Sequence, residues 1–314
     1  SPSPPSCSRG RDRVKIGLCN LEPQYVNLAI EKLRVYYQQR GDQVEDCSPQ
    51  EAVMFDKVYC SSIFTFTDKP TLPAICGGTG FDLTTKLPPE IKAIKPHKNI
   101  GFTTRGCFRW CPTCVVCKKE GGEVVKEDSL AAIWDGKSKV VKLLDNNILA
   151  LPDWFEETCR FAREHKIKLD HTQGLDHRLL TPEIARILAD TPHVEYHFAF
   201  DKPCYSDSVG EAISMLRDVG INRSTWYVLA GYDTTFEQDY ERVLFLREHS
   251  QNAFIMEYRE LPSTPKTKVI LDPRNAALKR WVNRKDWFQG VTFKEFVNRL
   301  ENKGYRKMFP ELVL

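Results

Sequence analysis

From residue 99 to residue 258 the chain alternates short apolar runs with longer segments whose apolar residues recur at helical spacing. The runs predict six strands, at 99–104, 139–145, 167–172, 193–201, 225–230 and 252–258. The segments between them predict five helices, at 128–134, 153–165, 181–189, 206–219 and 236–249. Strands joined through helices form a parallel sheet, and right-handed crossovers roll such a sheet into a barrel or part of one. The alternation therefore predicts an α/β fold with a partial (β/α)6 TIM-like barrel.

A smaller α/β unit is predicted in front of this barrel. The run "VKIGLC" at 14–19 indicates a buried strand, and the helical pattern after it ends at Gly41. Three more strand candidates follow, at 43–47, 55–61 and 73–78. Residues 14–95 are therefore expected to form a Rossmann-like domain. The stretch "GGTG" at 77–80 lacks the G-x-G-x-x-G spacing, which favours a plain turn over a phosphate-binding loop.

Composition gives the other boundaries and limits the partners. Residues 1–13 lack the apolar core of a signal peptide and predict a disordered tail, while 86–99 indicate a linker. The barrel is expected over 96–262, with a helical extension of two amphipathic helices over 263–314. A net charge of +3 over 314 residues gives no reason to expect a nucleic-acid or membrane partner. No apolar run reaches the roughly 18 residues of a membrane span, so a cytoplasmic protein is expected.

Four of the eleven cysteines fall in one loop after the first barrel strand, and they are Cys107, Cys111, Cys114 and Cys117. The others are scattered, and Cys19, Cys60 and Cys76 lie in strand-like runs, where a cysteine is usually a small buried hydrophobe. Without a secretion signal, a disulfide framework is not expected. The clustered cysteines are therefore better explained as metal ligands in a reducing compartment.

The spacing of the loop is C-x3-C-x2-C with one further cysteine at x2. Structural zinc sites use two C-x2-C pairs separated by a longer loop, and the chain has no second pair of this kind. An iron–sulfur cluster can take three thiolates from one compact loop. A zinc-binding interaction protein with four thiolate ligands stays open as the alternative.

The stretch "CFRWCPTC" at 107–114, preceded by "TRG", resembles the signature of the radical S-adenosylmethionine superfamily. The resemblance covers roughly residues 96 to 260. It implies a [4Fe–4S] cluster held by Cys107, Cys111 and Cys114, with one iron open to S-adenosylmethionine. It also implies an enzyme that cleaves this cofactor reductively to a 5′-deoxyadenosyl radical, which abstracts hydrogen from an unknown substrate. An electron donor such as flavodoxin or ferredoxin would be its partner.

The same resemblance implies residues that contact S-adenosylmethionine, namely Asp145, Asn146, Asn147, Gln173, Asp201 and Tyr232. The chain departs from the family pattern where Gly-Gly-Glu is absent after the second strand and where Thr113 replaces a frequent aromatic residue. Cys117 is extra, and is either a fourth ligand or an inert thiol. The front domain resembles a truncated cobalamin-binding domain without its D-x-H-x-x-G motif. We expect it to be a cap, with cobalamin as the alternative cofactor.

Polar residues alternate along the predicted barrel strands, where strands buried on both faces would be almost wholly apolar. Alternation places Glu195, His197 and Asp201 on one face of their strand. The polar positions expected in the barrel lumen are Lys168, Asp170, His197, Glu257 and Arg259. A lumen lined in this way predicts a polar substrate.

Overall fold

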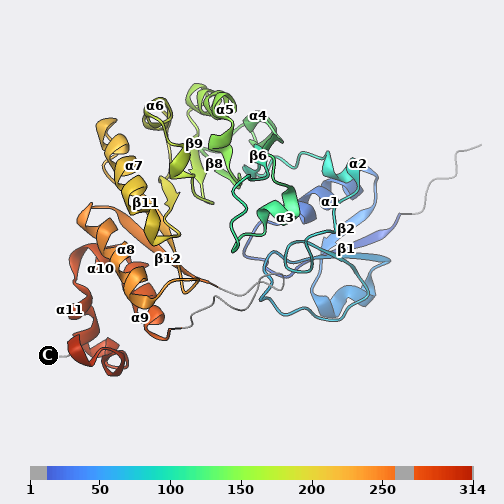
Figure 1. Ribbon diagram of the computed structural model, residues 1–314. Coiled ribbons are helices and arrows are strands. Elements are labelled where there is room, and N and C mark those ends of the chain that lie inside the picture. The colour runs from blue at the N-terminus through green and yellow to red at the C-terminus, as the bar shows by residue number, and fades with distance from the viewer. Residues whose placement is uncertain (1–12, 259–271, 313–314) are drawn as a thin grey trace, which may run out of the picture. The chain divides into compact units, whose positions relative to one another are not determined.

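The computed structural model describes residues 13–258 and 272–312 (Figure 1). Within them one compact unit ends at Pro96 and a second begins at His97. The predicted tail, apart from Arg13, lies outside the described residues. The predictions for Arg259 and for a boundary between residues 262 and 263 also fall outside them.

The first unit is built on a parallel sheet with the strand order β2-β1-β3-β4. Its strands are β1 (Lys15–Asn20), β2 (Gln43–Asp46), β3 (Lys57–Ser61) and β4 (Ile75–Gly77). Helix α1 (Leu28–Gln39) begins after Asn27, whose side-chain oxygen accepts the first free amides of the helix. Its apolar side packs on Ile16 and Leu18 from one face of the sheet. Hydrophobic burial on that face therefore holds the helix against the strands.

The other face of this sheet is covered by the 3₁₀ helix Pro49–Met54 and by neighbouring loops, which pack around Val58. The segment predicted as a linker, 86–99, also contributes to the unit. It contains the short helix α2 (Pro89–Lys92), and Ile91 is buried in the α1 core. The boundary between the units, after Pro96, lies within the predicted linker, and the part of the linker around Ile91 is packed into the first unit.

Parallel strands also form the sheets of the second unit, in the two sets β5-β8-β9 and β10-β11-β12. Their bounds are β5 (Ile100–Gly101), β8 (Val140–Leu143), β9 (Lys168–His171), β10 (His197–Ala199), β11 (Thr225–Ala230) and β12 (Asn252–Glu257). Two parallel bridges, Leu169 with His193 and Leu175 with Phe198, continue the backbone contacts from β9 toward β10. The chain is thus an α/β protein with parallel sheets.

Helices alternate with these strands as expected. They are α4 (Leu130–Ile133), α5 (Pro152–Glu164), α6 (Pro182–Asp190), α7 (Ser206–Asp218) and α8 (Phe236–Glu248). Helix α6 begins where Thr181 caps it, and Thr235 with Gln238 forms a capping box on α8. In Figure 1, α5, α6 and α7 lie in a row outside the strands. Their buried faces and the strands share one hydrophobic core.

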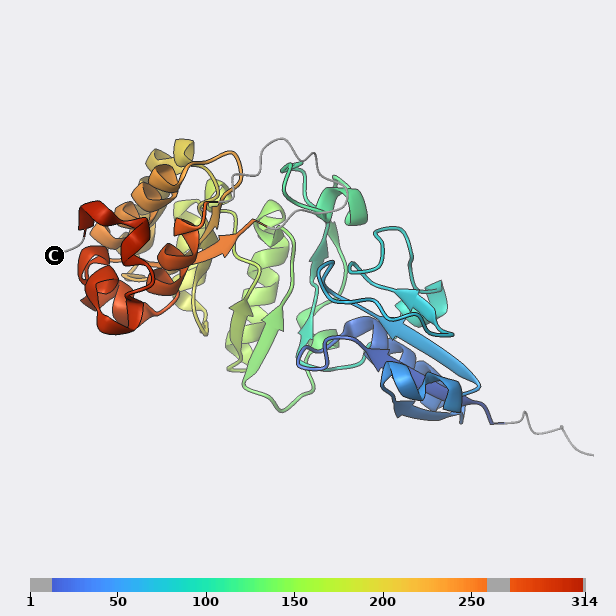
Figure 2. The same cartoon turned by 90° about the horizontal axis from the view of Figure 1, so that it is seen from below.

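Three short α-helices lie within residues 272–312, where the sequence predicted two. They are α9 (Arg274–Val282), α10 (Lys285–Gly290) and α11 (Phe293–Asn298). Thr292 caps the start of α11, so α10 and α11 are two separate helices. Figure 2 shows this group gathered beside β12, and α9 packs on that strand. Trp281 and Phe296 join the core of the second unit, so the helices are part of that unit's fold.

Two predicted strands are shorter than expected. The run 99–104 divides into β5, which pairs with β8, and β6 (Thr104–Arg105), which pairs antiparallel with β7 (Val125–Lys126). The run 193–201 forms a strand only at His197–Ala199. None of the helices in the described ranges is long and apolar enough to cross a membrane.

Candidate metal centre in the cysteine loop

The cysteine loop is closed at its base by the antiparallel pair β6 and β7. Gly106 follows β6 with a φ of +87°, and a β-carbon there would stand 1.9 Å from the carbonyl oxygen of Glu123. Only glycine fits both this backbone conformation and this close approach. The amide of Gly106 donates a hydrogen bond of 3.0 Å to Asn146 Oδ1, which ties the loop to the end of β8.

A buried carboxylate fixes the backbone just before the loop. Asp145 Oδ1 accepts hydrogen bonds from Thr103 Oγ1 at 3.0 Å, from Thr104 Oγ1 at 2.9 Å and from the Thr104 amide. All three residues are buried. Burial raises the pKa of Asp145 to about 6, although these hydrogen bonds act in the opposite direction. The predicted cofactor contact at Asp145 is therefore also a structural support of the loop.

Three thiols of the loop lie near one another. Burial raises the pKa of Cys114 to about 11, and repulsion by Cys111, Cys107 and Cys117 adds to the effect. The pKa of Cys111 is also raised by burial, with Cys107 adding to it and Arg178 opposing it. Asn147 Nδ2 lies 3.7 Å from Cys107 Sγ. The raised pKa values keep Cys111 and Cys114 as neutral thiols, and a bound metal ion would stabilise their thiolate form.

Cys117 has a structural contact of its own. It lies in the short helix α3 (Val116–Glu120), which was not predicted, and its side chain is buried. Its thiol donates a hydrogen bond of 2.7 Å to the carbonyl oxygen of Cys107. The amide of Val116, the first residue of this helix, donates to Cys114 Sγ at 3.4 Å. The hydrogen bond of Cys117 therefore connects the end of the loop to its beginning at Cys107.

An ionic network that the sequence did not indicate holds the outer part of the loop. Asp176 accepts hydrogen bonds of 2.7 Å from Arg109 Nε, within the loop, and of 2.7 Å from Arg178 Nε. Asn147 Nδ2 lies 3.4 Å from the same carboxylate. Burial alone would raise the pKa of Asp176, but the two arginines outweigh it and lower the pKa. Arg178 is a local partner, but Arg109 and Asn147 come from distant segments, so no local motif could have revealed the network.

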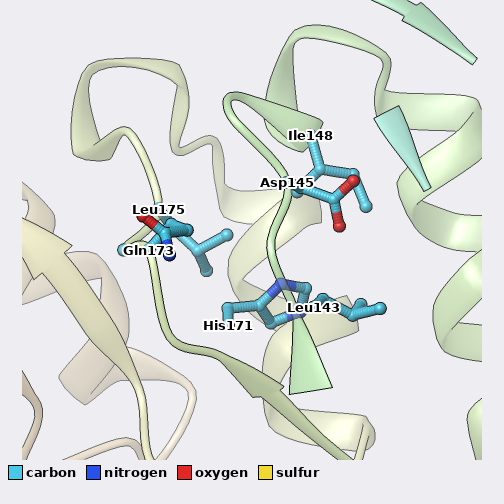
Figure 3. A pocket seen from close by; sticks show the side chains of 7 residues that line it. Leu143, Asp145, Ile148, His171, Gln173 and Leu175 are labelled. Carbon is cyan, nitrogen blue, oxygen red and sulfur yellow. The ribbon is translucent and has the colours of Figure 1, made fainter. Parts of the chain in front are cut away.

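A narrow hollow lies at the carboxyl ends of β8 and β9 (Figure 3). It is lined by Leu143, Asp145, Ile148, His171, Gln173, Gly174 and Leu175. Asp145 Oδ2 and His171 Nε2 are buried there without a hydrogen-bond partner among the described residues. Burial holds the pKa of His171 well below its usual range, so the imidazole is neutral. Gln173 lies across the hollow from Asp145 and is exposed.

Of the two remaining residues predicted to contact the cofactor, Asp201 interacts with the cysteine loop, whereas Tyr232 packs against another tyrosine. Asp201 lies two residues after the end of β10, and its charge adds to the raised pKa of Cys111. Its pKa is raised by burial, against the opposing charge of Arg242. That arginine is buried and donates to the carbonyl oxygens of Phe200 at 2.6 Å and of Leu229 at 2.8 Å, which fixes the strand ends beside Asp201. Tyr232 instead packs against the ring of Tyr258, with centroids 4.7 Å apart.

A second polar cluster lies on the predicted lumen face. His197 Nε2 is 3.3 Å from Glu195 Oε2, and His197 Nδ1 is 4.0 Å from Asp170 Oδ1. The imidazole stacks on Tyr227 with an angle of 7° between the rings. Lys285 from α10 forms an ion pair with Glu195. The structure therefore brings together Asp170 and His197, two of the residues that alternation placed on this face.

The lumen prediction for Glu257 is corrected by its contacts. Its carboxylate pairs with Lys279 of α9 at 2.8 Å. Glu257 is two residues after buried Ile255, so the two side chains lie on the same face of β12. The exposed positions of β12 are Phe254 and Met256. The sequence pattern assigned the polar Glu257 to the lumen face, whereas the exposed face of β12 carries the apolar side chains of Phe254 and Met256. Lys168 is exposed at the start of β9.

No three His, Cys, Asp or Glu side chains within residues 13–258 and 272–312 converge on a point that could hold one metal ion. Thiolates are ligands both of a structural zinc ion and of a [4Fe–4S] cluster. The donor set of the loop, three neighbouring thiols beside the buried amide of Asn147, fits the cluster in its chemistry. The unpartnered Asn147 Oδ1 adds an acceptor beside it.

A scan against protein-family models finds no family that matches the chain, and a search of curated proteins finds no significant match.

Proposed function

We propose that this chain is a radical S-adenosylmethionine enzyme. The observation that carries the proposal is the group of three mutually interacting thiols, Cys107, Cys111 and Cys114, directly after the first strands of a parallel α/β unit. The sequential strand order and the bridges at Leu169 and Leu175 are what a partial six-stranded barrel requires. The carboxyl ends of such strands are where barrel enzymes carry their chemistry.

In this proposal the three thiolates hold a [4Fe–4S] cluster. When bound, the cluster supplies the electron for reductive cleavage of S-adenosylmethionine to a 5′-deoxyadenosyl radical, which takes hydrogen from the substrate. Arg109 and Arg178 place positive charge around the thiols. Asn146 holds the loop backbone, and Asn147 orients its amide toward Cys107. Asp145 sets the position of the loop.

The polar cluster of Asp170, Glu195 and His197 supports a polar substrate. Two carboxylates flank one imidazole on the sheet face, with Lys142 Nζ 3.9 Å from Asp170 Oδ2. Groups of both signs on one face suit a ligand that also carries both. Asp201 lies nearer the cysteine loop and is proposed to contact the cofactor.

The first unit is proposed to be a cap. Its strand order places a topological switch point between β1 and β3, where open α/β sheets usually bind ligands. Glu22 fills that place with its own carboxylate, which accepts hydrogen bonds from the Ile63 amide at 2.9 Å and from Ser62 Oγ at 2.7 Å. An internal anion on these donors favours a structural role over the alternative of cobalamin binding.

Metal analysis after anaerobic purification and reconstitution tests the proposal. About four irons with matching sulfide per chain, and 5′-deoxyadenosine after addition of dithionite and S-adenosylmethionine, are expected. About one zinc per chain without sulfide would overturn the proposal. That result would favour the alternative, a zinc-binding interaction protein, for which the closeness of Cys117 to Cys114 is the supporting observation.

Single cysteine variants test the ligand assignment. Cys107→Ala, Cys111→Ala and Cys114→Ala should each lose the cluster and abolish cofactor cleavage, because each removes one of three ligands. Cys117→Ser is the matched control, since a hydroxyl can still donate to the Cys107 carbonyl. It should keep the visible absorption and iron content of the cluster. Loss of iron in the Cys117 variant would instead assign four thiolate ligands.

A further inference from the structure

Four thiols of the first unit gather on the sheet face opposite α1, far in sequence from the cysteine loop. Cys19 of β1 stands in register with Cys60 of β3, and Cys60 stands in register with Cys76 of β4. Directly paired residues on parallel strands point to the same face of the sheet. The three side chains therefore form a row across three adjacent strands. Cys47 follows β2 on the same side, next to Gly17.

The row is packed closely enough for its sulfur atoms to interact. Cys60 lies close enough to Cys19 on one side and to Cys76 on the other for both neighbours to raise its pKa. The Cys76 thiol itself donates to the carbonyl oxygen of Ala74 at 3.7 Å. Cys19 and Cys60 are 1% and 2% exposed, whereas Cys76 is only partly buried. Cys60 thus lies at the centre of the row, and Cys76 is its more solvent-accessible end. All three are free thiols.

Paired strands also bring the α-carbons to a distance that a disulfide accepts. Neighbouring strands lie about 4.8 Å apart, and disulfides span roughly 4.4–6.8 Å between α-carbons. An ordinary buried cysteine has no such partner, but Cys60 has two. We propose that Cys60 and Cys76 form a reversible disulfide site, with Cys19 as a second partner for Cys60.

The reaction with a disulfide oxidant such as oxidised glutathione balances in two steps. The Cys76 thiolate attacks the oxidant, forms a mixed disulfide and releases one glutathione thiolate. The Cys60 thiolate then attacks the Cys76 sulfur, forms the protein disulfide and releases the second glutathione. The two cysteines together lose two protons and two electrons, and the oxidant gains them. Cys19 can then attack Cys60 and release Cys76, with no further change in oxidation state.

Burial sets the order of events. It raises the pKa of Cys76, and the contact to Cys19 together with burial raises the pKa of Cys60, so both thiols react slowly at neutral pH. The oxidant reaches Cys76 first because Cys76 is the exposed end of the row. The disulfide should therefore form over a slow reaction with oxidised glutathione, and more quickly at alkaline pH.

The full chain treated with oxidised glutathione tests the proposal. Remaining thiols are alkylated, the protein is digested without reduction, and disulfide-linked peptides are identified by mass spectrometry. A linked pair that contains Cys60 with Cys76, or Cys60 with Cys19, is expected, and dithiothreitol should remove it. Peptide assignment separates this pair from any disulfide formed within the cysteine loop. A glutathione adduct on exposed Cys204 shows that the oxidant was active.

Cys60→Ala separates the proposed pair from simple thiol reactivity. Without Cys60, the mixed disulfide at Cys76 has no resolving thiol and should accumulate several-fold above its level in the unsubstituted chain. Cys47→Ala is the matched control and should leave the Cys60–Cys76 linkage unchanged. If Cys60→Ala fails to fold, the linkage map of the unsubstituted chain decides alone. Modified Cys204 without any linked peptide that contains Cys60 would overturn the proposal.

Discussion

At the scale of single residues, Asp145 is the side chain whose role the structure changes most. A resemblance assigned it to a cofactor, whereas its Oδ1 accepts from both threonines before the loop. The carboxylate therefore acts on the cysteines through the backbone that carries them. Its pKa of about 6 makes that support depend on pH.

Asp145→Asn should show this dependence as a difference in stability. The folded pKa lies above the ordinary value of 3.8, so protonation favours the folded state. The stabilisation is complete below the unfolded pKa and is lost as pH rises through about 6. Between pH 5 and 7.5 the unsubstituted chain should lose about 1 kcal/mol of unfolding free energy relative to the non-titrating variant. Urea titrations of both proteins without the cluster measure their unfolding free energies. A difference in unfolding free energy that does not change with pH would contradict the prediction.

At the scale of elements, the cysteine loop depends on one backbone position. Gly106→Ala would force a β-carbon against the Glu123 carbonyl oxygen, so the β6–β7 base must move. The variant should bind much less iron on reconstitution. Gly136→Ala is the control, because Gly136 also has a positive φ, of +79°, but nothing within 4 Å of the added carbon. Equal iron contents in the two variants would show that the loop base does not set the site.

Asp176 links the loop to the segment after β9, and its loss should loosen the loop. In Asp176→Asn both arginines lose an ionic partner, at a cost of about 1–3 kcal/mol. Iron should leave the reconstituted protein faster in the presence of a chelator. Glu183→Gln, in the exposed ion pair of Glu183 with Arg186, is the matched control and should release iron at the unsubstituted rate. Equal rates in all three proteins would remove Asp176 from the site.

How far the sequence predicts these elements depends on the range of the interactions that form them. The strand 225–230 was confirmed as β11, and α6 begins next to its cap, because burial and capping are local signals. The run 99–104 divides because Asp145, some 40 positions away, holds its second half. Asp176 has two partners from distant segments, Arg109 and Asn147, and no spacing rule connects them to it. Local pattern predicts elements, but side-chain networks need the fold.

At the scale of the whole molecule, each unit has a hydrophobic core of its own. All six tryptophans follow His97, so their fluorescence reports only the second unit. The buried thiols Cys19 and Cys60 report the first, because they become reactive when its sheet opens. The chain thus carries a separate probe in each unit.

Trp281→Ala should destabilise the second unit alone. Trp281 is fully buried among α8, α10 and α11, where it contacts Tyr240, Phe288 and Phe293, and its indole donates to the Val291 carbonyl at 2.9 Å. Its removal should cost about 3–5 kcal/mol and shift the fluorescence transition to lower urea concentration. The midpoint for alkylation of Cys60 should stay where it is. A parallel shift of both midpoints would instead show that the two units unfold as one.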